Sequence, residues 1–375
     1  MATANGTCSK ASVIVLGGCG FIGRNLVCHL IENDLVSHVR VVDKVPPQTA
    51  WLNSLHKKIF DDERVEFRSA NLIIPASCEA AFAADGISWD YVINCACETK
   101  TGQTDPVYQE GIVKLSLNCA MEAAKHNVKM FVELSSGHMA STEKAPHNED
   151  DTADPWIAVA RYKLQVEKEL KEIPSLNFCV LRPAIVYGIG DRHGLAPRLI
   201  VGAVYKHLNE VMKLLWTADL HLNTVHVRDV CRAIWLVATR DDTKGKIFNV
   251  VDEGDTTQGL ISTLISDIFG ISHDYYGYAL SMICKADMSS VVEEGNDKHM
   301  GPWAEACCSS GVENTPLTPF MDQELLYNKN LFMDGSRLKS LGFSCEIPVL
   351  TTQSLLEIVH DYADMMLFPR FLINA

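Results

Sequence analysis

The stretch Val13-Ile14-Val15-Leu16-Gly17-Gly18-Cys19-Gly20-Phe21-Ile22-Gly23 decides the fold of this chain. It begins with apolar, mostly β-branched residues, which are typical of a buried strand, and it then changes abruptly to glycine. A helical apolar pattern follows. Glycine allows a tight turn from strand to helix and a close approach of the backbone to a pyrophosphate, and the helix start offers unpaired N–H groups to that anion. We therefore predict a dinucleotide site with contacts at Gly17, Gly20, Phe21, Ile22 and Gly23.

An acidic residue follows at the expected distance. A second predicted strand, residues 38–42, ends at Asp43, twenty residues after Gly23. A carboxylate about 20 residues past the last glycine is expected to bind the ribose hydroxyls of a dinucleotide. It would also repel a 2′-phosphate, although Lys44 weakens this preference slightly. We therefore predict NAD as the cofactor.

Composition and charge set outer limits on the function. The 375 residues are 47% hydrophobic and 21% charged, as in an ordinary globular protein. The formal net charge of −14 argues against nucleic-acid and anionic-membrane partners. We find no signal peptide at the N-terminus and no apolar run long enough to span a bilayer. The 13 cysteines are scattered without zinc-site spacing, so we expect reduced thiols, a cytoplasmic protein and no metal.

Predicted strands and helices alternate through the first half of the chain. Further strands are expected at residues 65–67, 89–96, 129–134, 177–182 and 246–251, and helices at 76–84, 112–126 and 156–171. This alternation predicts an α/β fold, a doubly wound parallel sheet (Rossmann) with a smaller mixed C-terminal substrate lobe. We assign residues 1–188 to the NAD-binding domain, with 222–252 returning to it, and residues 189–221 and 253–375 to the lobe and C-terminal helices. Residues 293–316 are expected to form an exposed loop.

Ligands of such sheets bind outside the carboxyl ends of the strands. Asn71 follows the third predicted strand, where it is placed to meet an adenine, and small residues follow the fourth strand, where the cofactor could lie close. The further cofactor contacts that we predict at these strand ends are Asn71, Leu72, Cys95, Ala96, Pro183 and Val186.

The motifs together resemble the extended short-chain dehydrogenase/reductase family, in its NAD-dependent epimerase/dehydratase group. The resemblance rests on residues 17–23, 132–136, 181–188, 226–230 and 341–343, and it covers nearly the whole chain. It implies chemistry run by Ser/Thr, Tyr-x-x-x-Lys and the nicotinamide, in which the tyrosine carries a proton and the lysine lowers its pKa and binds the ribose. Ser136 matches the serine and Lys163 the lysine.

The catalytic tyrosine of that motif is missing. Val159 stands four residues before Lys163, and valine has no proton to give. Tyr162 adjoins the lysine, but neighbouring residues on a helix project about 100° apart. Three hypotheses stay open: His138 or Tyr187 serves as the acid/base, a distorted helix brings Tyr162 into the cleft, or the chemistry is lost and the cofactor is kept.

We predict an NAD-dependent oxidoreductase, epimerase or dehydratase that acts on a secondary alcohol or ketone of a small molecule. The resemblance makes a nucleotide-sugar the commonest case. In this hypothesis Ser136 binds the reacting oxygen, Lys163 holds the ribose, and the donor is undecided between Tyr162, His138 and Tyr187. The alternative is a catalytically silent NAD-binding sensor or scaffold. By analogy with the family, a homodimer could form through the helices that begin near 112 and 156.

Overall fold

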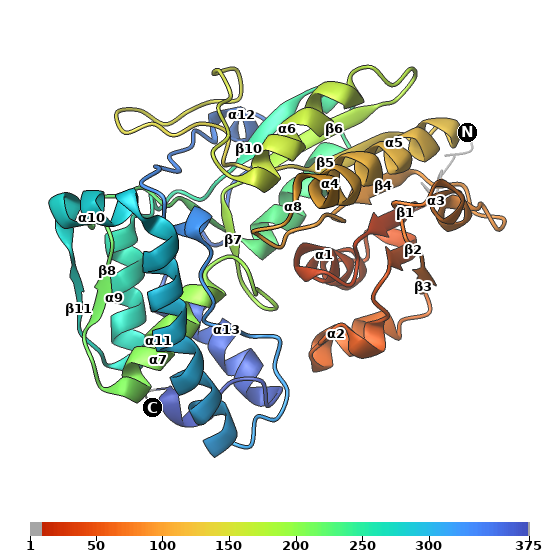
Figure 1. Ribbon diagram of the computed structural model, residues 1–375. Coiled ribbons are helices and arrows are strands. Elements are labelled where there is room, and N and C mark those ends of the chain that lie inside the picture. The colour runs from red at the N-terminus through yellow and green to blue at the C-terminus, as the bar shows by residue number, and fades with distance from the viewer. Residues whose placement is uncertain (1–9, 374–375) are drawn as a thin grey trace.

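The computed structural model describes residues 10–373, and a seven-stranded parallel sheet forms its centre (Figure 1). The strand order is β10-β6-β5-β4-β1-β2-β3. Their bounds are β1 (Ala11–Leu16), β2 (Val36–Asp43), β3 (Val65–Ser69), β4 (Tyr91–Asn94), β5 (Met130–Leu134), β6 (Phe178–Pro183) and β10 (Ile247–Val250). The direction of winding reverses between β1 and β4, which pair in parallel. The predicted doubly wound Rossmann sheet is confirmed, and the reversal places the ligand crevice at the ends of β1 and β4.

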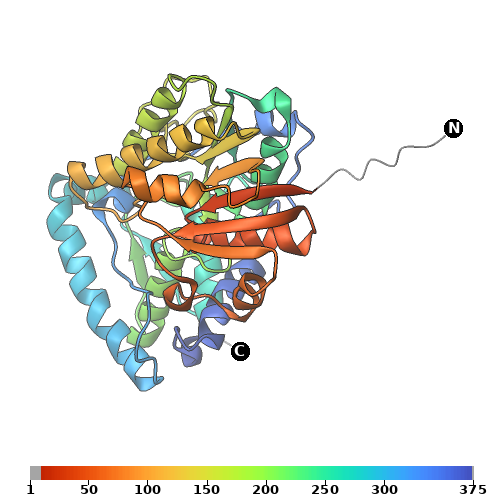
Figure 2. The same ribbon diagram turned by 90° about the vertical axis from the view of Figure 1, so that its right-hand side faces the viewer.

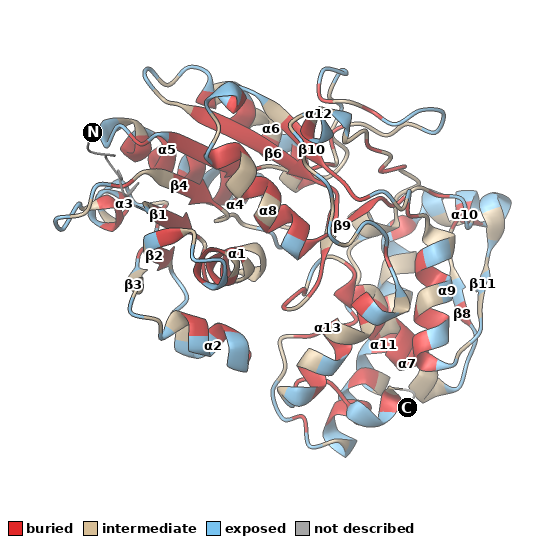
Figure 3. Ribbon diagram, turned by 180° about the vertical axis from the view of Figure 1, so that it is seen from behind, coloured by how far each residue is buried: buried red, intermediate tan, exposed pale blue. Residues whose placement is uncertain are grey.

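The strands are apolar on both faces because helices cover both. Val13 and Val15 of β1 pack in a cluster with Leu26 of α1 (Phe21–Glu32) and with α8 (Val227–Ala238). Ile14 and Leu16 pack on the other side with α3 (Pro75–Phe82), α5 (Leu115–Lys125) and α6 (Ala158–Leu170). The alternation follows from the two-residue period of a strand. Figure 3 shows the buried strands in red and the exposed outer sides of the helices in pale blue.

The helix expected at 112–126 begins earlier than the sequence suggested. It starts at α4 (Asp105–Tyr108), continues through a π-helical segment η2 (Gln109–Lys114) and ends as α5. Pro106 fits the first turn of α4, where its missing N–H costs no helical bond. The apolar period is interrupted by the π-helical turn, and this explains why the start was placed too late.

The C-terminal lobe is built mainly from helices. Its helices are α7 (Ala196–Leu208), α9 (Gln258–Phe269), α10 (Gly277–Ala286), α11 (Met288–Ser309) and α13 (Thr352–Asp364). The short α12 (Ser336–Lys339) packs beside β10 of the large sheet instead (Figure 1). Two small parallel sheets join β7 (Ile185–Tyr187) to β9 (Thr224–His226) and β8 (Met212–Leu214) to β11 (His273–Tyr275). Shorter helical segments are α2 (Ser54–Phe60), η1 (Pro47–Thr49), η3 (Asp241–Thr243), η4 (Gln323–Leu326) and η5 (Arg370–Leu372).

The loop expected at 293–316 was wrong, because most of it belongs to α11, which runs along the outside of the lobe (Figure 2). Gly295 and Pro302 lower the helix propensity of this segment. Its buried face includes Asn296 and His299, and these polar residues hide the helical period of the apolar ones. Packing against α7 stabilises the helix in spite of this weak local signal.

Two further observations concern membrane-spanning helices and disulfide bonds. No helix within residues 10–373 has the length and apolar character needed to cross a membrane. All twelve cysteines in the described part of the chain are free thiols.

Candidate functional site

The glycine loop between β1 and α1 is shaped to receive a pyrophosphate. Gly17 has φ +70°, and a Cβ there would lie 2.6 Å from the backbone nitrogen of Ala96. A Cβ on Gly23 would lie 2.3 Å from the Gly17 carbonyl oxygen. Gly20 caps α1 without a side-chain hydrogen bond, so the N–H groups of the first turn, at Phe21 and Ile22, stay available to an anion.

Asp43 lies beside this loop at the end of β2. Its Oδ2 accepts a hydrogen bond from the Cys19 N–H at 3.1 Å, and its Oδ1 accepts one from the Val45 N–H at 3.0 Å. Burial raises the pKa of Asp43, while the backbone donors oppose the rise. The carboxylate is partly buried next to the pyrophosphate loop, where a ribose-binding group belongs. The loop and this carboxylate fit a bound dinucleotide.

Arg24, which the sequence analysis did not single out, holds the glycine loop in place. Its buried guanidinium donates to the carbonyl oxygens of Cys19, Ala50 and Trp51. It therefore ties the loop to the segment that follows β2. The sequence did contain a signal for this role, because Arg24 is a charged residue one position after the last glycine and lies on the buried face of the helix.

The other predicted cofactor contacts fall into different surroundings. Cys95 and Ala96 lie against Gly17, as expected of residues that border the cofactor. Asn71 is exposed, and its Oδ1 accepts from the Ile73 N–H at 3.2 Å, whereas Leu72 is buried. Pro183 ends β6 and accepts from the Gly137 N–H at 2.8 Å, and Val186 lies in β7. The contact of each residue with NAD stays a prediction.

Ser136 and His138 come together just beyond β5. The Ser136 Oγ lies 3.2 Å from His138 Nδ1 and accepts a hydrogen bond from the His138 N–H at 3.2 Å. The imidazole packs edge-on against Trp156, with ring centroids 5.2 Å apart. Burial lowers the pKa of His138 to about 4, helped by the nearby charges of Arg198 and His147. The imidazole is therefore neutral at pH 7 and can accept a proton.

Tyr162 and Lys163 point to different neighbourhoods, as adjacent residues on a helix do. The Tyr162 ring stacks on Tyr108 of α4, with centroids 5.5 Å apart, and burial together with the nearby Asp105 raises the pKa of its hydroxyl. Val159, in the first turn of α6, packs against the apolar cluster beneath that helix. The α6 segment from Ala158 to Leu170 is regular helix, so the distortion considered for Tyr162 is not observed.

Lys163 is held in a buried ion pair that the sequence analysis missed. Its Nζ donates to Glu133 Oε1 at 2.8 Å, and the side chains are only 4% and 0% exposed. Glu133 also accepts from Asn94 at 2.7 Å and from Ser116 at 3.1 Å. Although burial opposes the charged form, Cys97 and Glu133 raise the pKa of Lys163. A glutamate inside the apolar strand 130–134 was the signal for a buried cation opposite it.

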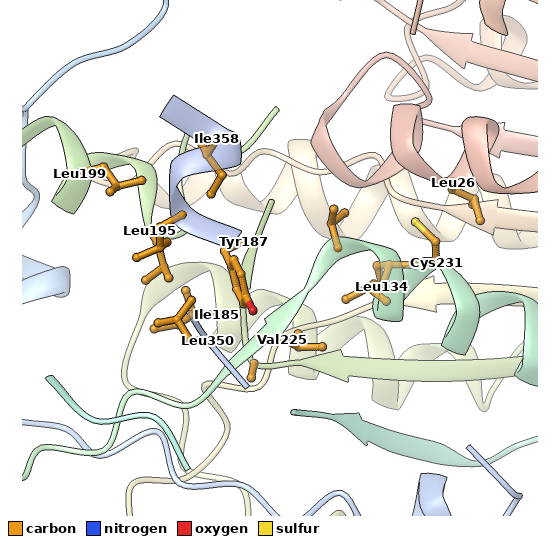
Figure 4. Packing of buried hydrophobic residues seen from close by; sticks show 14 of the residues in the cluster. Leu26, Leu134, Ile185, Tyr187, Leu195, Leu199, Val225, Cys231, Leu350 and Ile358 are labelled. Atoms are coloured by element: carbon orange, nitrogen blue, oxygen red, sulfur yellow. The ribbon is translucent and has the colours of Figure 1, made fainter. Parts of the chain in front are cut away.

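Tyr187, the third candidate donor, lies in the hydrophobic core (Figure 4). It is 0% exposed and lies among side chains such as Ile185, Leu195 and Ile358. Its ring packs edge-on against His226 at 5.1 Å. Tyr187 thus contributes to the packing of β7 against the lobe.

The comparisons with known proteins agree with this geometry. A family model described as the NAD dependent epimerase/dehydratase family matches residues 13–250. UDP-glucose 4-epimerase of Thermotoga maritima, solved with UDP-glucose, is 20% identical with a TM-score of 0.67, over 95% of this chain and 99% of that one. dTDP-glucose 4,6-dehydratase of Bacillus anthracis, solved with NAD, is 15% identical with a TM-score of 0.69, over 96% and 99%. At these identities the likeness shows the fold, and no curated protein matches the chain.

Proposed function

Because the chain belongs to the NAD dependent epimerase/dehydratase family, we propose that it is an NAD-dependent oxidoreductase of a secondary alcohol or ketone. Membership of this family confirms the resemblance that the motifs indicated. It also confirms the prediction of NAD as the cofactor, because the family is NAD-dependent. The observation that carries the proposal is the Ser136–His138 pair, because it supplies a proton acceptor where the family tyrosine is absent. NAD, when bound, supplies or takes the hydride.

The pair works as a short relay. The backbone N–H of His138 donates to Ser136 Oγ, and in the tautomer that the relay requires, with the ring proton on Nε2, the Ser136 O–H donates to Nδ1. A substrate hydroxyl bound to Ser136 can then pass its proton to Oγ while the serine proton moves to Nδ1. The imidazole is neutral at pH 7, so its lone pair is free to take this proton, while the pKa of about 4 makes it a weak base that passes the proton on readily.

Lys163 has a smaller role in this proposal than the family motif gives to its lysine. One of its three donors is used by Glu133, and another lies against the Cys97 thiol. A third donor remains for a ribose hydroxyl. With no phenol four residues earlier, its charge orients the cofactor and has no tyrosine pKa to lower.

The test is turnover by the NAD-loaded chain against a panel of secondary alcohols and ketones, followed at the nicotinamide absorbance. We expect Ser136→Ala and His138→Gln to lower kcat by about a hundredfold or more, the usual share of a positioned acid/base. Tyr162→Phe is the matched control and should leave kcat within about twofold. Loss of turnover in Tyr162→Phe, with His138→Gln unaffected, would move the proton to the phenol.

A silent NAD-binding sensor is the second candidate, and Val159 favours it. The missing tyrosine and the lysine committed to Glu133 together remove the family's proton pathway. Tight binding of NADH with no turnover on any substrate class would support this candidate. The homodimer, the domain limits and the cytoplasmic location stay predictions.

A further inference from the structure

The C-terminal lobe contains a cavity of about 500 Å³ between α7, α9 and α11, with β8 and η4 completing its wall. This volume lies within the range of about 300–1,000 Å³ typical of small-molecule sites. Its lining is mostly aliphatic, including Val201, Met212, Leu214, Ile261, Ile265 and Val292. The cavity therefore offers an apolar surface to whatever it holds.

The polar groups in the wall are mostly occupied by the protein itself. The Gln258 amide donates to the Leu215 and Thr217 carbonyl oxygens at 2.9 and 3.0 Å. Asn296 exchanges two hydrogen bonds with the Met321 backbone, at 3.0 and 2.8 Å. Such groups are satisfied within the fold and give a ligand little to bind.

Arg198 is the exception. Its partly buried side chain lines the cavity, and within residues 10–373 its guanidinium has neither a hydrogen bond nor an ion pair. The carboxylate that acts on it electrostatically is Asp191, whose two oxygens already accept four backbone N–H groups of residues 193–196. His299 Nδ1 is a second buried polar atom of the wall without a partner. Burying an unpaired arginine in apolar surroundings costs free energy, unless an anion pairs with its guanidinium.

The charge balance of the cavity fits one negative charge better than two. Lys298 is neutralised by Glu210 at 2.6 Å, and Lys213 lies over the Tyr276 ring at 5.8 Å. Glu294 adds a negative charge to the wall. A diphosphate needs several free cations for its two charges, whereas Arg198 alone can pair with one carboxylate.

Two of the cavity's walls connect it to the proposed catalytic groups, which do not themselves line it. After burial, the positive charge of Arg198 is the next cause that lowers the pKa of His138. Leu325 and Leu326 line the cavity, and the preceding Glu324 accepts a hydrogen bond from the Ala158 N–H at 2.9 Å. Ala158 adjoins Val159, where the family motif has its tyrosine.

We propose that the substrate of this site is an amphipathic monoanion, an apolar alcohol or ketone whose single carboxylate pairs with Arg198, and that it is not a nucleotide-sugar. The inference rests on the proposed function, since it supplies the substrate for the Ser136–His138 relay. The apolar body occupies the aliphatic part of the lobe, and the guanidinium fixes its orientation. Val159 packs against the apolar cluster beneath α6 and offers the substrate no hydroxyl.

The experiment is calorimetric titration of the NAD-saturated chain with decanoate, with decanol and with UDP. We expect decanoate to bind, UDP not to bind, and Arg198→Gln to weaken decanoate roughly tenfold to a hundredfold, as loss of a charge-assisted hydrogen bond does. Decanol should bind both proteins equally. Lys213→Gln is the matched control, because it removes an exposed positive charge from the same cavity, and it should change decanoate binding less than about twofold.

Two results would overturn the inference: equal binding of decanoate to the native chain and to Arg198→Gln, or UDP binding more tightly than decanoate. If Arg198→Gln does not fold, Arg198→Lys replaces it in the test. Arg198→Lys should lose an intermediate part of the affinity for decanoate, because it keeps the positive charge but not the paired N–H donors of the guanidinium. Turnover is not required for these measurements. Binding without turnover would count against the proposed function alone, and turnover without decanoate binding would count against the substrate class alone.

Discussion

The buried pair of Lys163 and Glu133 predicts a strong energetic coupling. At 2.8 Å two unit charges attract by about 6 kcal/mol at an effective dielectric constant of about 20, and desolvation of both groups offsets much of this gain. Removal of one partner leaves the other charge buried and uncompensated. We therefore expect Glu133→Gln and Lys163→Met each to lower the free energy of unfolding by about 3–5 kcal/mol, a large part of a typical stability of about 5–15 kcal/mol.

The double variant distinguishes this explanation from simple damage to the core. With both charges gone, its loss of stability should fall at least about 2 kcal/mol short of the sum of the two single losses. Urea unfolding followed by circular dichroism measures all three free energies. The exposed pair Lys114–Glu110, 3.4 Å apart, is the matched control, and Lys114→Met should cost less than about 1 kcal/mol. Strictly additive losses at 133 and 163 would refute the coupling.

Four further predictions concern the cofactor loop, the helix α11, the carboxylate of Asp43 and acid stability. Gly23→Ala should abolish detectable NADH fluorescence enhancement, because the new Cβ would lie 2.3 Å from the Gly17 carbonyl oxygen in the cofactor loop. Gly295 of α11 has open space around it, so Gly295→Ala should raise the free energy of unfolding, measured in urea, by about 0.5–1 kcal/mol. Asp43→Asn should weaken NADH binding about tenfold or more and narrow the preference over NADPH, which parallel titrations would show; unchanged affinity would remove Asp43 from the site. Burial lowers the pKa of His56 to about 3 and of His226 to about 4, so at these two sites the folded state binds fewer protons than the unfolded state, and their contribution to stability should be full above about pH 6.5 and fall towards pH 4. Asp191 and Asp252, whose pKa burial raises to about 6, act in the opposite direction, so the test is a comparison: His56→Gln should lose less of its urea midpoint between pH 7.5 and pH 5 than the native chain, and an equal loss would contradict this.

The first half of the chain could be predicted because its local signals agree with its tertiary structure. The glycines after residues 13–16 fix a strand, a turn and a helix start, and Asp43 falls where the next strand ends. Each of these elements has both an apolar period and a boundary residue. Local preference and global packing therefore gave the same answer.

The lobe was harder because its helices are stabilised by packing rather than by propensity. α11 contains Gly295, Gly301 and Pro302, and its buried stripe carries Asn296 and His299. The helix exists because that stripe meets α7, which lies far away in the sequence. No window of the sequence contains this information.

The candidate site shows a similar division. The sequence predicts Ser136 and Lys163 as site residues from their distance from strand and helix, and the structure adds that Ser136 lies beside His138 while Lys163 pairs with Glu133. Such pairings depend on how neighbouring strands and α6 are arranged, which spacing alone does not contain. The cavity around Arg198 is assembled from five separated elements and has no motif at all.

The departures from the family motif are physically connected. In the proposed assignment, Val159 takes the place of the catalytic tyrosine, so Lys163 has no phenolate to stabilise and its ammonium need not be free. Glu133 then becomes acceptable within β5, because it pairs with that ammonium and the two charges satisfy each other. In a family enzyme with the tyrosine, the same glutamate would compete for the lysine and raise the pKa of the phenol. Restoring the tyrosine alone should therefore restore little proton transfer by that route, and Val159→Tyr should need Glu133→Gln beside it to gain activity that no longer depends on His138.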